Sequence, residues 1–358
     1  MPYRSNDPYN DLPLLPPLAI ETVRVLRSCI AASRALAELK GASNLIPNQS
    51  ILINSIPLQE ARLSSEIENI VTTQDALFRA AIEEPGRADP ATREVLRYRA
   101  ALRYGNEALA RRPLNIDLIL ELCAILLDKP VELRDQESVI IEDQAAATIV
   151  YTPPRGRPLI VSLLRNLEIF LQQPGGLDPL LKMAVAHYQF EAIHPFVDGN
   201  GRTGRILNLL ILLQAGLLEI PVLYLSRYII QNKSEYYRLL HLVTEQQAWE
   251  GWLLFMLTAV EQTARWTTGR IQAIRFLLDV TAERCRVEIP KIYSKELVEL
   301  IFYQPYCKIA FLVQAGLAER KTASQYLQEL ERLGIVVGEK RGREVIYKHP
   351  ALLEILSA

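Results

Sequence analysis

Apolar residues recur at helical spacing along most of the chain. This periodicity predicts helices at 20–39, 57–71, 90–110, 180–192, 202–213, 236–244 and 249–274. Asp178 before Pro179 is a typical helix start, with a capping residue ahead of proline in the first turn. The segment 139–151 differs, because β-branched residues flank a polar, small-residue middle, and it predicts a hairpin flap. The pattern therefore predicts a mostly α-helical protein with a small β element.

The pattern changes again after residue 290. Helices at 294–303 and 322–333 precede β-prone stretches at 335–337 and 344–347, with a charged turn at 338–342 between them. This order resembles a winged helix-turn-helix. Its recognition helix would span 321–334, with Thr322 as the N-cap and Gly334 ending the helix.

The charges of this C-terminal segment leave its partner open. Lys340, Arg341 and Arg343 would lie at the tip of the wing. From Glu319 to Lys348 there are seven basic and five acidic residues, a balance of +2. Two of the acids would oppose phosphates from the recognition helix, namely Glu329 and Glu331. DNA binding, dimerisation and docking of a target protein all remain alternatives.

Length and composition describe a folded chain without a general affinity for polyanions. Its 358 residues predict two to three domains. Hydrophobic residues make up 49% and charged residues 23%, which are ordinary values for globular proteins. Forty basic side chains against forty-one acidic ones leave a net charge of −1. This balance excludes a protein held to nucleic acid over its whole surface, although one domain could still bind it.

The cysteines and the apolar segments predict a cytoplasmic protein without a membrane partner. The four cysteines form no CxxC pair, which disfavours a zinc site or a disulfide framework: Cys29, Cys123, Cys285 and Cys307. Free thiols are typical of a reducing compartment. The N-terminus lacks the pattern of a signal peptide, and polar residues and a proline interrupt the apolar window 206–225.

The segment HPFVDGNGRTGR, residues 194–205, combines features of a phosphate site. Arg202 and Arg205 can clamp phosphate oxygens bidentately. Amides at the start of the following helix would attract an anion. Three glycines let the backbone approach a ligand closely: Gly199, Gly201 and Gly204.

The same segment supplies groups for chemistry at the phosphate. Asp198 offers a hard oxygen ligand of the kind that Mg²⁺ takes beside phosphates. His194 can act as a general base near neutral pH. Together these residues predict transfer of a phosphoryl or nucleotidyl group to a hydroxyl.

The spacing H-x-F-x-D-G-N-G-R-x-x-R resembles the core motif of the Fic family, whose members mostly transfer AMP from ATP to protein hydroxyls. The resemblance implies that His194 deprotonates a Ser, Thr or Tyr hydroxyl, which attacks the α-phosphorus of ATP, and that Asp198 holds Mg²⁺. Phe196 would point into the core and fix the loop. ATP binding is assigned, with Arg205 at the γ-phosphate, to Gly199, Asn200, Gly201, Arg202, Thr203, Gly204 and Arg205.

A second motif, SSEIEN at 64–69, resembles the inhibitory motif S/T-x-x-x-E-G/N of Fic proteins. Ser64, Glu68 and Asn69 match it, and helical spacing places Ser64 and Glu68 on one face. The resemblance implies that Glu68 pairs with Arg205 in the place of the γ-phosphate and so inhibits the enzyme. An ordinary solvated carboxylate is the alternative.

Tyr236 and Tyr237 resemble the tyrosine pair that lines the nucleoside pocket in related Fic proteins. We expect Tyr237 against the adenosine, whereas a place in the core is the alternative, above all for Tyr236. Some relatives carry Asn where this chain has Thr244, which leaves the base preference open. The flap at 139–151 lies where family members present a target segment by β-strand addition.

The expected fold is a Fic-type helical core with a β-hairpin flap and a C-terminal winged helix-turn-helix domain. Its regions would be 1–110 with the inhibitory helix, 111–275 as the catalytic core and 276–358 as the winged module. The expected function is a protein adenylyltransferase that modifies a target protein and itself and releases pyrophosphate; a homodimer is left open. The alternatives are removal of AMP and a DNA-binding regulator whose core senses a nucleotide.

Overall fold

The computed structural model describes residues 3–82, 88–135, 141–143, 148–341 and 344–357, and helices dominate it, as predicted. Before the flap the helices are α1 (Val23–Ser43), α2 (Ser50–Ile67), α3 (Gln74–Ala80), α4 (Pro90–Leu109) and α5 (Ile116–Leu127). After it they are α6 (Arg157–Gln172), α7 (Pro179–Ile193), α8 (Asn200–Gln214), α9 (Leu225–Gln231), α10 (Lys233–Gln246) and α11 (Trp249–Glu288). None of the described helices combines the length and apolar character needed to cross a bilayer.

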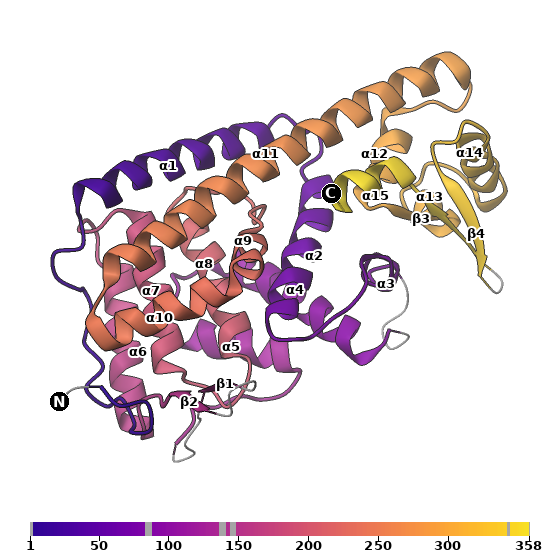
Figure 1. The fold of residues 1–358 in the computed structure, drawn as a ribbon. Coiled ribbons are helices and arrows are strands. Elements are labelled where there is room, and N and C mark those ends of the chain that lie inside the picture. The colour runs from indigo at the N-terminus through magenta and orange to yellow at the C-terminus, as the bar shows by residue number, and fades with distance from the viewer. Residues whose placement is uncertain (1–2, 83–87, 136–140, 144–147, 342–343, 358) are drawn as a thin grey trace.

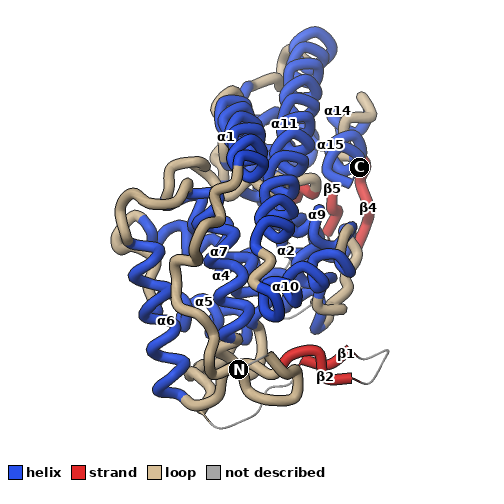
Figure 2. The backbone as a smooth tube through the Cα atoms, turned by 60° about the vertical axis from the view of Figure 1, so that its left-hand side comes forward, coloured by secondary structure: helices blue, strands red, loops and turns tan. Residues whose placement is uncertain are grey.

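The described flap is a two-stranded antiparallel hairpin, which confirms that prediction for β1 (Ile141–Asp143) and β2 (Thr148–Tyr151). Residues 139–140 and 144–147 of the predicted flap lie outside the described part. Figure 2 shows the strands in two separate places, the flap and the C-terminal sheet.

Helices α7 and α8 form the centre of the molecule. Nearly every side chain of α7 is buried, which is typical of a helix that is apolar on all sides. Its N-terminus begins as predicted, because the Asp178 side chain accepts a hydrogen bond from the Leu180 amide at 2.8 Å. Helix α8 packs against α7, α4 and α5, while α7 also contacts α6 and α11. The loop between α7 and α8 is therefore held between rigid, buried elements.

Helix α11 is much longer than the sequence pattern predicted. It runs to Glu288 rather than ending near residue 274, and α1 lies along its first half (Figure 1). Its buried residues continue at helical spacing through Ile271 and Leu278 to Cys285. Charged residues lie between these buried positions, so the sequence pattern did not show that the apolar face of α11 continues beyond residue 274. The expected boundary between 275 and 276 thus falls inside one continuous helix.

Helix α2 was predicted at 57–71 but spans Ser50–Ile67, with Pro57 inside it. Proline is disfavoured inside a helix, yet α2 continues through Pro57. The helix instead begins earlier and ends just before Glu68, where Asn69 takes the left-handed φ of 61°. Helix α2 packs against α4 and α9 and also against two C-terminal helices, α12 (Lys295–Tyr303) and α15 (Pro350–Ser357).

The C-terminal module is compatible with the predicted winged helix-turn-helix. After α12 come β3 (Tyr306–Lys308), α13 (Ile309–Gln314), α14 (Arg320–Arg332), β4 (Val337–Arg341) and β5 (Glu344–Lys348). The antiparallel sheet has the order β3-β5-β4. Gly334, with a φ of 70°, follows the end of α14 as predicted.

Two details of the prediction for this module were wrong. Helix α14 begins at Arg320, with Glu319 at the N-cap position, so Thr322 lies inside the helix and does not cap it. Residues 338–341, expected in a turn, belong to β4, because their backbone pairs with β5 in the sheet. Lys340 and Arg341 are exposed at the end of β4, while Arg343 lies outside the described residues.

Candidate active site

The loop between α7 and α8 is folded by its own backbone and side chains. His194 ends α7 with a left-handed φ of 48°, and Gly199 opens α8 with a φ of 82° that favours glycine. The side-chain nitrogen of Asn200, Nδ2, donates to the Phe196 carbonyl at 2.8 Å. The side-chain oxygen, Oδ1, accepts from the Phe196 backbone amide at 2.9 Å. Phe196 is fully buried, as predicted. Because the Asn200 side chain is already hydrogen-bonded within the loop, Asn200 would bind an anion through its backbone amide.

Arg134 braces the end of α7 and was missed by the sequence analysis. Its Nε donates to the His194 carbonyl at 2.6 Å, and its Nη2 donates to the Ile193 carbonyl at 2.9 Å and the Pro154 carbonyl at 2.7 Å. The side chain is buried. These bonds fix the backbone that carries the histidine. No motif marks this arginine, because its partners are carbonyls distant in sequence.

A cavity of about 310 Å³, called the loop cavity here, opens between the loop and the end of α2. It brings together most of the predicted catalytic and phosphate-binding residues with carboxylates from two other elements. Its lining residues are Glu68, Ile70, Glu94, His194, Val197, Asp198, Gly199, Asn200, Gly201 and Arg202. Thr203, Gly204 and Arg205 are buried and are not among these lining residues. Amides at the start of α8 border the cavity, as an anion site requires.

His194 faces the loop cavity in a form suited to accept a proton. Burial, followed by the charge of Arg134, lowers the pKa of His194 to about 4. Its imidazole is therefore neutral at pH 7. The Nδ1 atom is buried and has no hydrogen-bond partner within the described part of the chain. A neutral imidazole beside a phosphate site is the state that a general base needs.

Arg202 is buried and held at the wall of the loop cavity. Its Nη1 lies 3.3 Å from Glu94 Oε1, and its Nη2 lies 3.4 Å from Asp198 Oδ1. Glu94, on α4, is a second residue that the sequence analysis missed. Its helical segment shows only an ordinary charged pattern, so its contact with Arg202 follows from packing alone.

Asp198 is the candidate magnesium ligand. Its side chain is 62% exposed, and its Oδ1 accepts the Gly199 amide at 2.6 Å. Among the described residues, no three His, Cys, Asp or Glu side chains gather into a metal cluster. A single accessible carboxylate fits Mg²⁺, because this ion is commonly held by one or two carboxylates together with substrate phosphates and water.

Arg205 is enclosed by the end of α2 and makes three hydrogen bonds to it. Its Nε donates to Ser64 Oγ at 2.8 Å, and its Nη2 donates to the Ser64 carbonyl at 2.9 Å and to Glu68 Oε1 at 2.8 Å. Burial works against ionisation of Glu68, but the Arg205 guanidinium prevails and lowers the pKa of its carboxyl. The predicted contact between the two motifs is confirmed.

The Glu68 carboxylate also covers the start of α8. A Cβ atom added to Gly201 would collide with Glu68 Oε1, so the carboxylate lies directly on this backbone. Asn69 explains the turn that brings it there, because asparagine tolerates the left-handed conformation better than most residues. The left-handed conformation at position 69 thus explains why Gly or Asn follows the glutamate in the motif.

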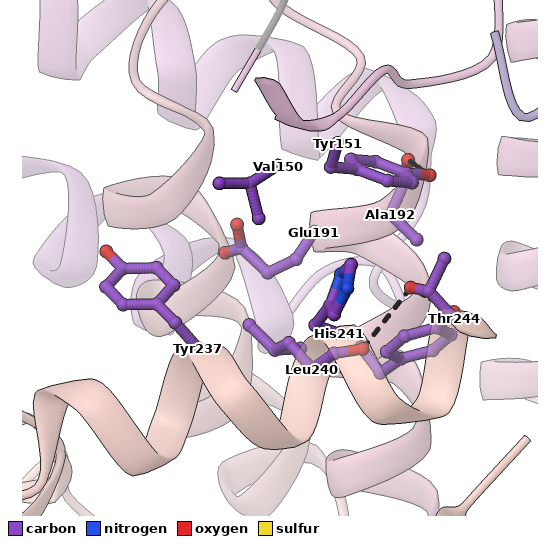
Figure 3. Close-up of a pocket in the computed structure, with 9 residues that line it drawn as sticks. Val150, Tyr151, Glu191, Ala192, Tyr237, Leu240, His241 and Thr244 are labelled. Carbon is purple, nitrogen blue, oxygen red and sulfur yellow. Dashed lines mark hydrogen bonds between the residues drawn. The ribbon is translucent and has the colours of Figure 1, made fainter. Parts of the chain in front are cut away.

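The two neighbouring tyrosines of α10 have different surroundings. Tyr236 is buried, and its hydroxyl lies 2.8 Å from His187 Nε2. It therefore belongs to the core, the alternative considered for it. Tyr237 is 42% exposed and borders a second cavity of about 90 Å³, called the apolar cavity here. The lining residues are Val150, Tyr151, Tyr188, Glu191, Ala192, Tyr237, Leu240, His241 and Thr244 (Figure 3).

Thr244 and Glu191 are polar residues in the wall of the apolar cavity. The Thr244 hydroxyl lies 3.0 Å from the Tyr188 hydroxyl, so it is held within the wall. Burial raises the pKa of Glu191 to about 7. The Oε1 atom of Glu191 is buried and has no hydrogen-bond partner among the residues described. Glu191 belongs to no motif, so nothing in the sequence distinguishes it from the other polar residues of α7.

Three sequence models of one family match this chain. The Fic/DOC family N-terminal model matches residues 26–107, and the Fic/DOC family model matches residues 113–212. A third model, described as the C-terminal domain of SoFic-like protein adenylyltransferases, matches residues 277–352. The chain belongs to the Fic/DOC family.

Curated relatives of this Fic chain are called protein adenylyltransferases. The protein adenylyltransferase fic-1 of Caenorhabditis elegans is 31% identical over 176 residues, which cover 46% of this chain and 32% of that protein. The protein adenylyltransferase Fic of Drosophila grimshawi is 30% identical over 198 residues, covering 53% and 38%. The Fic chain thus matches only about a third of the length of these relatives.

Solved structures share the fold. A Fic family protein from Desulfovibrio desulfuricans G20 has a TM-score of 0.60 at 20% identity, covering 94% of this chain and 98% of that one. Residues 134–508 of Fic-1 from C. elegans give a TM-score of 0.51 at 22% identity, covering 69% and 74%. At these identities the likeness shows the Fic fold, which confirms the expected fold class.

Proposed function

We propose that this Fic protein is an adenylyltransferase that transfers AMP from ATP to Ser, Thr or Tyr hydroxyls of proteins, and that Glu68 inhibits it. The observation that carries the proposal is the ion pair between Arg205 and Glu68, at 2.8 Å, beside the phosphate-binding start of α8. A buried arginine, a carboxylate against the Gly201 backbone and a neutral histidine are the parts of a restrained nucleotide site.

The loop cavity supports the binding of phosphates. Backbone amides at Gly199 to Gly201 begin α8 and favour negative charge. Arg202 adds a guanidinium whose Nε has no partner within the described residues. Asp198 would hold Mg²⁺, which neutralises charge on the phosphate oxygens of bound ATP.

His194 supports the chemical step. In the proposed reaction, the oxygen of the target hydroxyl forms a bond to the α-phosphorus, and its proton passes to the His194 imidazole. The bond between the α-phosphorus and the bridging oxygen breaks, and pyrophosphate leaves with that electron pair. Because the pKa of His194 is lowered to about 4, the imidazole is free to take the proton at neutral pH.

Glu68 supports the inhibition. Its carboxylate neutralises Arg205 and fills space over Gly201, where phosphate oxygens would approach the amides. ATP would then bind in a productive pose only when this contact opens. If the open state were populated at about 1%, the apparent affinity for productive ATP would fall about 100-fold, or about 2.7 kcal/mol.

The decisive experiment is mass spectrometry of the Glu68→Gly protein after incubation with ATP and Mg²⁺. We expect a mass increase of one AMP group on the protein itself or on an added acceptor. A matched control is Glu66→Gly, which changes a carboxylate paired with Arg62 near the end of the same helix and leaves Arg205 restrained. Glu68→Gly combined with His194→Ala should lose the modification. Equal incorporation with and without the histidine would reject the mechanism.

The reverse reaction, removal of AMP, is a second candidate. Glu68 is 37% exposed and lines the same cavity as His194 and Asp198, so its free carboxylate surface is available to orient a water molecule. Incubation of an AMP-modified protein with Mg²⁺ separates the two directions. AMP release that requires Glu68 favours removal, whereas no release favours transfer alone.

DNA binding by the C-terminal module is a third candidate, favoured by the surface of α14. Exposed or partly exposed polar residues gather along a groove there: Arg320, Lys321, Ser324, Gln325 and Gln328. Glu329 pairs with Arg332, and Glu331 accepts the Gly338 amide at 2.8 Å, so both acids are engaged at the other end of the helix. An electrophoretic shift with the full chain that is abolished by Lys321→Glu would support it.

A further inference from the structure

Glu191 is a half-buried glutamate of the site, with a buried Oε1 atom, to which the proposed mechanism gives no role. It lies on α7, three residues before His194, and lines the apolar cavity (Figure 3). Its Oε1 atom has no hydrogen-bond partner among the described residues. Leaving a buried acceptor unsatisfied costs on the order of 1–3 kcal/mol, and native structures rarely do so. An acceptor atom without a partner, on a residue that lines a cavity, indicates a ligand that donates a hydrogen bond to it.

The point on α8 that Glu191 contacts from α7 identifies the part of the ligand that it would meet. At the start of α8, Gly201 borders the loop cavity, where the phosphates are proposed to bind. Three residues further along the helix, a Cβ atom at Gly204 would collide with Glu191 Oε1. Glu191 also lines the apolar cavity together with Tyr237. In a nucleotide the ribose lies between the phosphates and the base. Glu191 likewise contacts α8 three residues after Gly201 of the loop cavity and borders the apolar cavity.

We propose that Glu191 accepts a hydrogen bond from a ribose hydroxyl of the bound nucleotide and thereby selects ribonucleotides over deoxyribonucleotides. This inference rests on the proposed nucleotide site. It assigns the sugar to Glu191, the phosphates to the loop cavity and the base to the apolar cavity.

The charges around Glu191 support a neutral donor as its partner. The charge of Arg205 acts on Glu191, but its guanidinium donates hydrogen bonds to Ser64 and Glu68 instead. A phosphate would be repelled by the carboxylate. Tyr237 and His241 border the same cavity from α10, and Figure 3 shows the Glu191 carboxylate in the space between Tyr237 and Val150. A hydroxyl donates to a carboxylate without adding charge to this poorly solvated place.

The experiment compares dissociation constants of ATP, 2′-deoxy-ATP and 3′-deoxy-ATP by calorimetry on the full chain carrying Glu68→Gly. We expect ATP to bind about tenfold or more tightly than at least one deoxy analogue, because a site built to bind a hydroxyl rejects the analogue that lacks it. Adding Glu191→Ala should bring the ratio close to one, mainly by weakening ATP. Glu191→Gln, which keeps an acceptor of the same shape, should give an intermediate ratio.

Two outcomes would overturn the inference. One is an equal affinity for all three nucleotides with Glu191 intact, and the other is an unchanged ratio in Glu191→Ala. A purely structural role predicts equal weakening of all three nucleotides, which also contradicts it. Failure of the proposed function looks different: ATP binds with ribose selectivity, but the His194-dependent mass increase is absent. Thermal unfolding of Glu191→Gln confirms that the compared proteins are folded.

Discussion

Arg202 and Arg205 lie three residues apart on α8, are almost equally buried, and have different partners. Arg202 pairs with Asp198, from the loop before its own helix, and with Glu94 of α4. Arg205 makes its hydrogen bonds to Ser64 and Glu68, at the end of α2. One arginine is therefore part of the wall of the loop cavity, whereas the other is restrained by a distant segment.

This difference indicates which contacts could regulate the site. The partners of Arg202 belong to the binding cavity itself, so changing them alters the site. The partners of Arg205 lie at the end of α2, next to a residue with a left-handed φ, and Glu68 also lines the loop cavity. In the proposed mechanism Glu68 would compete with ATP for the Arg205 guanidinium. We infer that inhibition acts through Arg205 and not through Arg202.

The variant that releases Arg205 should change the rate of AMP transfer the most. Glu68→Gly should raise the initial rate of AMP transfer about 100-fold, because the restrained state no longer competes with ATP. The measurement is incorporation of labelled AMP at fixed ATP and Mg²⁺. A rate equal to that of the unchanged protein would show that the ion pair does not limit the reaction.

Ser64→Ala should give a smaller rise, on the order of tenfold. The substitution removes the 2.8 Å bond from Arg205 Nε but leaves the bonds to the Ser64 carbonyl and to Glu68. A hydrogen bond to a charged group contributes about 1.5–3 kcal/mol, and part of it is regained from water. The rate of Ser64→Ala should lie between the unchanged protein and Glu68→Gly; a decrease would instead place Ser64 in the productive state.

Glu94→Ala tests the other arginine. It removes the partner 3.3 Å from Arg202 Nη1, and in the inhibited protein it should raise the rate by less than about threefold. Arg205 stays restrained in this variant, so no release is expected. A rise in rate as large as that of Glu68→Gly would contradict the assignment of inhibition to Arg205 alone, because it would show that inhibition can act through either arginine.

The smallest expected effect concerns pH. Because burial and Arg134 lower the pKa of His194 to about 4, the base is already neutral above about pH 5. The kcat of Glu68→Gly at saturating ATP should therefore change by less than about twofold between pH 6 and 8, and should fall only as the histidine becomes protonated at lower pH. A fall centred near pH 6.5 would show that the histidine titrates as if exposed.

The core motif is the part of the site that sequence could predict most fully. Residues 194–205 are adjacent in the chain, so the glycines there could be read from the sequence as places of close backbone approach, and Gly199 has a positive φ. The burial of Phe196 was expected through the family resemblance, and the structure confirms it. The contact between Glu68 and Arg205, 137 residues apart, was predicted only through the family resemblance. Periodicity alone gave no reason for those two residues to meet.

Patterns within the sequence were enough to predict the helical class and the flap, because repeating side-chain spacings act over a few residues. The spacing of the loop residues predicted a chemistry that the proposed experiments test. Three contacts are visible only in the tertiary structure: Arg134 binds the backbone at His194, Glu94 pairs with Arg202, and Glu191 lines the apolar cavity. These contacts join residues from separate helices, and they exist only once packing has set the distances between those helices. The same cause explains the length of α11, whose apolar face is recognisable only against the elements that cover it.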